Sequence, residues 1–141
     1  MHKPTHWTLA LWLRIQEPRI VSVIQFFVYL AAMAGGLAAV LSPPRSIEAT
    51  AGAGITFYWA WLLLVGGTVG AVAVLPGVWW LERSAVLACT GAVLIYAVNI
   101  LALHVTENGN RLVQLFMIII VALHFIKRWF SIRRYAYDPE R

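Results

Sequence analysis

Long apolar runs separated by short polar segments make up most of this chain. Each run reaches or approaches the roughly 20 residues that a helix needs to cross a bilayer. Proline ends the first two, at Pro43-Pro44 and at Pro76-Gly77, because proline cannot continue a helix. We predict an all-α integral membrane protein in which a four-transmembrane-helix bundle forms a single domain over residues 1–141. The predicted spans are residues 20–41, 55–75, 84–105 and 112–130.

The segments outside the spans have distinct expected roles. Residues 5–17 are too short to span and predict an interfacial segment, which Pro18 separates from the first span. The loop over residues 42–54 is rich in small residues and predicts a flexible connection, whereas residues 81–83 predict a short turn between antiparallel spans. Residues 131–141 form a basic tail.

The fourth span is short. Only the 15 residues 112–126 separate Arg111 from Lys127, and they cover roughly 22 Å against a hydrocarbon core near 30 Å. Lys127 and Arg128 must therefore snorkel, the bilayer must thin, or neighbouring protein must shield this end of the helix.

Composition and charge support the membrane assignment. The chain is 61% hydrophobic and 12% charged, far from the balance of a soluble domain. Its net charge of +5 comes from residues that flank the spans, which favours membrane topology over nucleic-acid binding. With both termini in the cytoplasm, only Arg45 and Arg111 lie outside, so the positive-inside rule predicts an N-in, C-in protein. The inner residues are then Lys3, Arg14, Arg19, Arg83, Lys127, Arg128, Arg133, Arg134 and Arg141.

Amphipathic side chains near the span ends predict anchors at the membrane interface, where aromatic rings and long basic side chains gather. The predicted anchors are Trp7, Trp12, Trp59, Trp79, Trp80, Trp129, Lys127 and Arg128.

Small residues recur at the spacing that lets helices approach closely in lipid. Gly66 and Gly70 form a GxxxG step, and Gly35 and Gly36 each follow an alanine by four residues. These positions predict helix contacts either within the bundle or between subunits, and the second choice predicts a homo-oligomer.

Few polar residues lie inside the predicted spans, and an unpaired amide in hydrocarbon is costly. Asn99 and Gln114 should therefore point toward protein, and Tyr96 shares the Asn99 face. These residues predict either hydrogen bonds that hold the bundle or a polar seam that hydrates when subunits rearrange. Glu82 is expected to pair with Arg83, Lys127 or Arg128, because these basic residues lie at the same end of the predicted bundle.

Catalytic and metal-binding patterns are missing from the sequence. It contains no H-E-x-x-H, no G-x-S-x-G and no phosphate-binding glycine loop. Cys89 is the single cysteine, and neither His104 nor His124 has an acidic partner within its own span. We expect no enzyme activity, no cofactor and no metal, and a proton pathway is not favoured.

The segments between the spans resemble a family of small four-span membrane proteins encoded by actinobacteriophages, which are often described as holin-like. The resemblance covers roughly residues 14–140. The motifs that carry it are Glu17-Pro18-Arg19, Pro43-Pro44 with Ser46-Ile47-Glu48, Leu75-Pro76-Gly77, Leu81-Glu82-Arg83, Gly109-Asn110-Arg111 and Tyr135-x-Tyr137-Asp138-Pro139.

The resemblance implies a multi-pass protein of the bacterial host's cytoplasmic membrane. Its first functional hypothesis is a holin-like protein that oligomerises and assists lysis, although few polar residues are available to line a hole. The second is a phage membrane protein that forms no pore and binds a host-envelope or lysis partner, in superinfection exclusion or lysis regulation. A small transporter or enzyme subunit is the third, and the lack of acids inside the predicted spans weighs against it.

Overall fold

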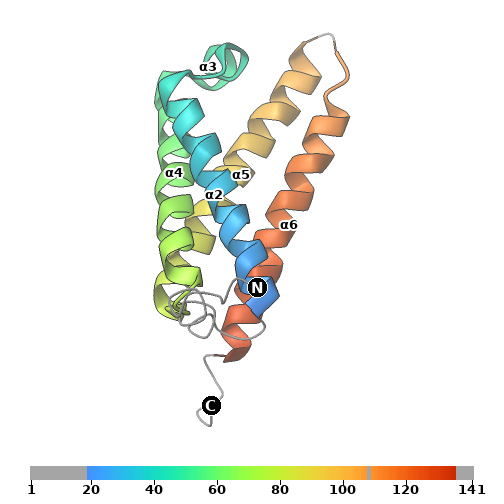
Figure 1. The fold of residues 1–141 in the computed structure, drawn as a ribbon. Coiled ribbons are helices and arrows are strands. Elements are labelled where there is room, and N and C mark those ends of the chain that lie inside the picture. Colours follow the sequence, from blue (N-terminus) through green and yellow to red (C-terminus); the bar gives the residue numbers. More distant parts are fainter. Residues whose placement is uncertain (1–18, 108, 136–141) are drawn as a thin grey trace, which may run out of the picture.

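The computed structural model describes residues 19–107 and 109–135, and over these residues the chain is helical without strands. Its helices are α2 (Arg19–Leu41), α3 (Arg45–Ala51), α4 (Ala53–Val74), α5 (Trp79–Thr106) and α6 (Leu112–Tyr135) (Figure 1). All of them except α3 are long and apolar enough to cross a membrane, which confirms the predicted all-α fold with four candidate spans. The predicted interfacial segment and its anchors Trp7 and Trp12 lie outside the described residues.

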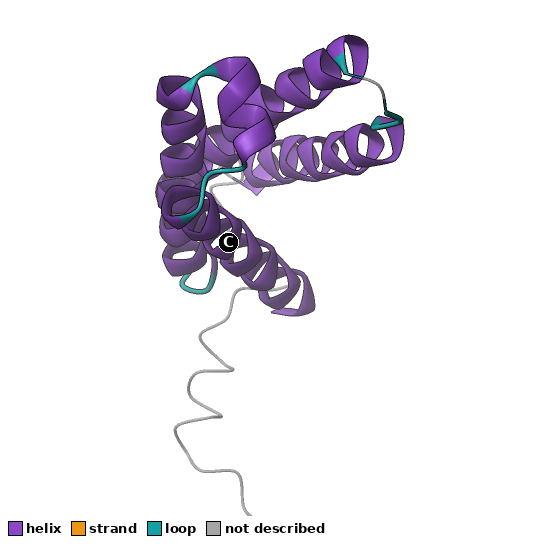
Figure 2. Ribbon diagram, turned by 90° about the horizontal axis from the view of Figure 1, so that it is seen from above, coloured by secondary structure: helices purple, strands orange, loops and turns teal. Residues whose placement is uncertain are grey.

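The four long helices pack in chain order. α2 contacts α4, α4 contacts α5, and α5 contacts α6. α2 and α6 approach each other at the end of the bundle that holds the α4–α5 turn, and they diverge toward the end that holds α3 (Figure 1). Seen from above, the α5 and α6 pair opens away from α2 and α4 (Figure 2). We refer to these two ends as the α4–α5 end and the α3 end.

The turn between α4 and α5 lies earlier in the chain than predicted. Pro76 and Gly77 reverse the chain, with Gly77 at a φ of 72°, and α5 begins already at Trp79. The predicted turn over residues 81–83 is therefore wrong, because Leu, Glu and Arg favour a helix and the reversal is complete before them. As a result, Glu82 lies in the first turn of α5 and faces the interior of the bundle.

The loop over residues 42–54, expected to be flexible, contains the ordered helix α3. Pro44 precedes its first turn, where its fixed φ suits a helix start, and Gly52 at a φ of 84° separates α3 from α4. Ile47 is only 1% exposed and attaches α3 to α4 and α5. The sequence did not identify Ile47 as an anchor, because it lies in a loop that is rich in small residues.

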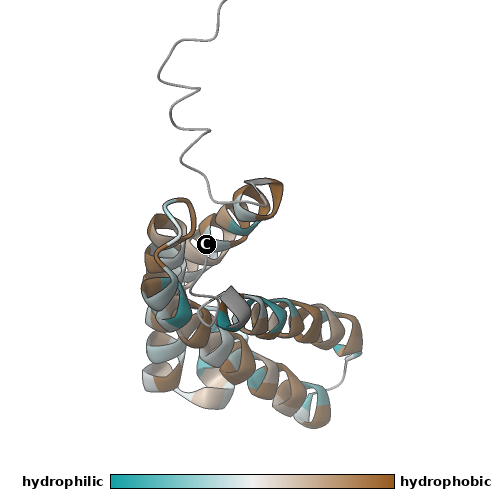
Figure 3. Ribbon diagram, turned by 90° about the horizontal axis from the view of Figure 1, so that it is seen from below, coloured by the Kyte–Doolittle hydropathy of each residue, from teal (hydrophilic) through white to brown (hydrophobic). Residues whose placement is uncertain are grey.

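The helices consist largely of hydrophobic residues (Figure 3). Large apolar side chains are exposed along the length of α6, among them Val113, Phe116, Ile120 and Leu123. A soluble protein rarely leaves so much apolar surface open to water. This surface is consistent with contact to a lipid bilayer.

Candidate functional site

A charged pair lies inside the bundle near the α4–α5 end. The Glu82 side chain is 0% exposed, and Arg128 of α6 donates to it twice. Arg128 Nε lies 2.7 Å from Oε1 and Nη2 lies 3.0 Å from Oε2. This bidentate geometry is the strongest arrangement that the two groups can form. Of the three partners expected for Glu82, the structure selects Arg128.

Tyr29 of α2 joins the same carboxylate. Its hydroxyl donates to Glu82 Oε1 over 3.2 Å, and its buried ring lies 6.0 Å from that of Phe125 between centroids. Gly70 of α4 leaves the space that this ring occupies, because a Cβ at residue 70 would overlap the Tyr29 ring. Three helices thus meet at one carboxylate, and the fourth accommodates the tyrosine.

A second polar contact lies one helical turn away. His124 Nε2 is 2.9 Å from Gln25 Oε1, and His124 is the donor because an amide oxygen can only accept. Gln25 and Tyr29 are four residues apart on α2, and His124 and Arg128 are four apart on α6, so each pair shares one helix face. Gln25 Nε2 is buried without a hydrogen-bond partner among the described residues.

These five residues form what we call the polar cluster: Gln25, Tyr29, Glu82, His124 and Arg128. Sequence reasoning included Arg128 among the possible partners of Glu82 but missed Gln25 and Tyr29, which are 99 and 53 positions from their partners in the chain. The sequence does contain a signal for the cluster, because α2 and α6 each carry a stripe of two polar residues four positions apart, Gln25 and Tyr29 on α2 and His124 and Arg128 on α6. The stripe is hard to recognise in the sequence, because a basic pair such as Lys127 and Arg128 at the end of a span also predicts an anchor at the membrane interface.

Burial of an ion pair inside a bundle has energetic consequences. Desolvation of the two charges offsets most of their attraction, so an apolar pair of similar volume can be as stable or more stable. Removal of one partner, however, leaves an uncompensated charge and is strongly destabilising. An ionisable residue within a membrane helix therefore suggests a role other than stability.

Two of the predicted interface anchors point into the bundle. Arg128 is an internal ion-pair partner, and Trp59 is only 5% exposed with its ring 5.1 Å from that of Tyr96 between centroids. Neighbouring helices cover both side chains. Trp80 is 75% exposed and Lys127 is exposed, so these two side chains point away from the bundle.

Trp79 and Trp129 are both half-buried at the α4–α5 end. The guanidinium of Arg83 lies over the Trp129 ring, 4.9 Å from its centroid. This cation–π contact gives Arg83 a partner separate from the neighbouring Glu82.

The predicted small-residue positions lie at several kinds of contact. A Cβ at Gly36 would overlap the backbone of Leu64, and one at Gly66 would crowd Cys89 Sγ, so both mark close helix approach. Gly67, which the sequence analysis did not single out, lies against the backbone of Met33 in the same way. Gly35 has no tight neighbour, since its Cβ would be 3.8 Å from Leu63 Cδ2.

A polar contact between α5 and α6 joins Tyr96 to Gln114, and Asn99 takes no part in it. Gln114 Nε2 donates to the Tyr96 hydroxyl over 2.9 Å. Asn99 is buried, but its Nδ2 donates to the Ile95 carbonyl of its own helix over 2.8 Å. An interhelical hydrogen bond from Asn99 is therefore not present among the described residues, because the amide satisfies itself locally.

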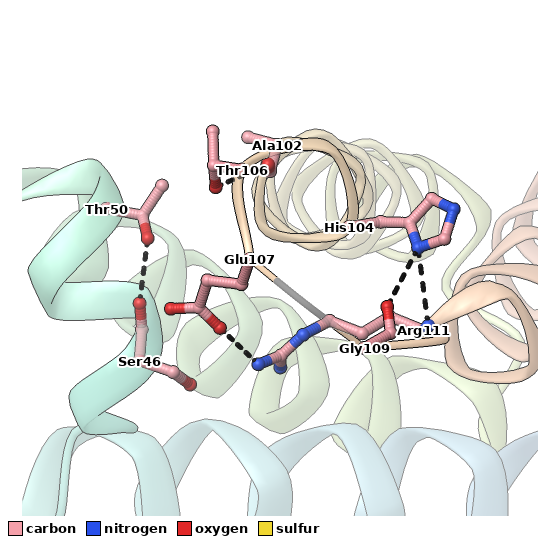
Figure 4. A network of polar contacts seen from close by, with 8 residues as sticks. All are labelled: Ser46, Thr50, Ala102, His104, Thr106, Glu107, Gly109 and Arg111. Atoms are coloured by element: carbon pink, nitrogen blue, oxygen red, sulfur yellow. Dashed lines mark hydrogen bonds and ion pairs between the residues drawn. The ribbon is translucent and has the colours of Figure 1, made fainter.

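A separate set of polar contacts lies between the end of α5 and the start of α6, at the α3 end (Figure 4). Arg111 pairs with Glu107, and His104 Nδ1 lies 3.2 Å from the Gly109 carbonyl and 3.5 Å from the Arg111 amide nitrogen. These contacts are partly solvent-exposed and act within one turn. They connect the end of α5 with the start of α6.

The described residues contain no group of three histidine, cysteine, aspartate or glutamate side chains that could hold a metal ion. Comparison with protein-family models, curated proteins and solved structures found no match to this chain. We therefore consider the polar cluster to be the candidate functional site.

Proposed function

We propose that this chain is a holin-like membrane protein, which accumulates in a bacterial cytoplasmic membrane as a packed bundle and then oligomerises into lesions that assist lysis. The observation that carries this proposal is the polar cluster, which joins three helices inside a protein whose surface suits lipid. The resemblance to holin-like phage proteins supports the same conclusion.

A lesion in a membrane needs a wettable lining. Few polar residues were apparent inside the predicted spans, but the polar cluster brings a carboxylate, a guanidinium, an imidazole, an amide and a phenol to one place. In the packed state these groups satisfy one another away from lipid. In a rearranged oligomer the same groups would face water, where their hydration offsets the lost contacts.

α6 is the helix best placed to move. It packs along α5, and it meets α2 through His124 on Gln25 and Phe125 on Tyr29. Much of the rest of its surface is open to lipid. Separation of α6 from α2 would therefore break the polar cluster and expose it in one step, as expected of a two-state switch.

Orientation belongs to the same proposal. Arg45 and Arg111 lie at the α3 end, whereas Arg83, Lys127, Arg128 and Arg133 lie toward the α4–α5 end. Placing the α4–α5 end in the cytoplasm satisfies the positive-inside rule. Both termini are then cytoplasmic, and the polar cluster lies in the inner half of the membrane.

The test is inducible expression in a bacterial host, alone and together with an endolysin that cannot cross the membrane by itself. We expect growth to continue until an abrupt loss of turbidity that requires both proteins, and an energy poison should advance that moment. Continued growth at high protein levels, with or without the poison, would contradict the proposal.

A partner-binding protein that forms no lesion is the second candidate. The observation that favours it is the ordered surface at the α3 end, where α3 and the Glu107–Arg111 pair present a defined shape outside the bundle. Under this alternative, crosslinking should recover one specific envelope protein or lysis protein from cells that never lyse.

A further inference from the structure

The polar cluster contains more basic groups than acidic groups. Glu82 is its single carboxylate, and Arg128 occupies both carboxylate oxygens at 2.7 and 3.0 Å. These two charges cancel, so the cluster is neutral as long as His124 is neutral. Gln25 and Tyr29 carry an amide and a hydroxyl, which supply no negative charge near neutral pH. A proton on His124 would therefore give the cluster a net positive charge.

The surroundings of His124 offer no carboxylate to balance that proton. On α2, the neighbour of its Nε2 atom is the neutral Gln25 oxygen at 2.9 Å. On α6, the charged groups that act on it are Lys127 and Arg128, and both are basic. On α5, Glu82 is already bonded to Arg128. The other acidic residues that the structure describes lie at the α3 end.

Protonation of His124 has two opposing effects on the packed bundle. A charged imidazole donates a stronger hydrogen bond to Gln25 than a neutral one. It also places a cation without a counter-ion beside Arg128, at a half-buried position. The second effect is the larger, because burial of an unpaired charge is costly and one amide oxygen replaces only part of the hydration that is lost. The charged form of His124 therefore favours separation of α6 from α2.

We propose that His124 is a proton-sensitive switch, whose protonation gives the polar cluster a charge that it cannot pair and thereby opens the bundle between α2 and α6. Histidine suits this role because it changes charge between about pH 5 and 8. The hydrogen bond to Gln25 joins α6 to α2, so the added charge appears at the contact that has to part. The switch rests on the proposed function, in which the same separation precedes the lesion.

The experiment measures helix separation and permeability on the full chain in lipid vesicles, with the same pH on both sides of the membrane. Spin labels on Ile24→Cys and Phe130→Cys, in a Cys89→Ala background, report the distance between two exposed positions on α2 and α6. A dye enclosed in vesicles that hold the unlabelled parent reports permeability. We expect the label distance to increase from pH 8 to pH 5. Dye release should rise by about 5-fold or more, the lower end of the usual coupling between a bound ligand and a conformational change.

Matched histidine variants locate the effect. His124→Gln keeps a hydrogen-bonding side chain that cannot be protonated in this range, so its label distance and dye release should be the same at both pH values. His104→Gln removes the histidine between α5 and α6 at the α3 end and should keep the pH response of the parent. Circular dichroism at both pH values identifies any variant that does not fold.

A label distance in the parent that is the same at pH 8 and pH 5 would overturn the switch, and this comparison needs no histidine variant. A pH response that survives in His124→Gln would also overturn it. Failure of the proposed function has a different signature: the label distance would change with pH through His124, but neither pH would release the dye.

Discussion

At the scale of single residues, the Glu82–Arg128 pair joins α5 to α6 inside the bundle. The pair is buried and bidentate, and Tyr29 donates to the same carboxylate. Loss of either charge leaves the other without compensation inside a low-dielectric interior. The pair therefore favours one packing of α5 against α6.

We expect Arg128→Met and Glu82→Leu each to lower the free energy of unfolding by about 3–5 kcal/mol. The double variant should recover most of this loss, because two apolar side chains leave no charge unpaired. Unfolding of the purified proteins in mixed micelles, monitored by circular dichroism, measures both effects. If the single and double variants were equally destabilised, the pair would not be energetically coupled.

Gly67 and Gly91 provide a matched comparison for helix contact. A Cβ at Gly67 would overlap the Met33 backbone, whereas one at Gly91 meets nothing within 4 Å. Gly67→Ala should lower stability by about 1–3 kcal/mol through overpacking. Gly91→Ala should be neutral or stabilising by up to about 1 kcal/mol, because alanine favours a helix. Equal folded yields in mild detergent would place the α2–α4 contact elsewhere.

The positions of the helices could be predicted from the sequence, whereas the partners of individual side chains could not. Hydrophobicity and turn residues predicted the four apolar helices to within a few positions. Partners such as Gln25 and His124 depend on how distant helices rotate about their axes, which composition does not encode. The Asn99 amide bonds to the preceding turn of its own helix, and the sequence pattern does not distinguish this local bond from one between helices.

At the scale of elements, α3 shows that an apparently flexible loop can be fixed by one side chain. Ile47 is buried against the ends of α4 and α5, whereas the rest of α3 is largely exposed. The sequence showed the loop's prolines and glycines but could not show that helix ends would cover this isoleucine. The sequence also did not show that α5 begins at Trp79, and this early start places Glu82 inside the bundle.

Ile47→Ala should release α3 and leave the four long helices in place. Removal of a buried isoleucine side chain costs on the order of 2–5 kcal/mol, which exceeds what a seven-residue helix can offset. Limited proteolysis should then cut within residues 42–53 at least several-fold faster than in the parent. The control is Ser46→Ala on the exposed side of α3, and equal cleavage of both variants would refute the anchoring role.

At the scale of the whole molecule, we expect the distribution of charge between the two ends to set the orientation in the membrane. Single cysteines introduced in a Cys89→Ala background can report the orientation. Cys89 has no partner cysteine, so its replacement breaks no disulfide. Cysteines at Ser46 and Asn110 should react with an impermeant reagent added outside intact cells. Those at Ser84 and Arg133 should react only after the cells are opened. The reverse pattern would invert the bundle.

We propose that the polar cluster allows the packed bundle to rearrange into a membrane lesion, and potassium efflux reports that rearrangement. Efflux is followed after induction in cells that accumulate equal amounts of the parent or of the Glu82→Leu/Arg128→Leu double variant. We expect abrupt efflux from the parent. We expect little or none from the folded double variant, whose apolar pair cannot be hydrated. Efflux of equal size and timing from both proteins would contradict the role of the polar cluster.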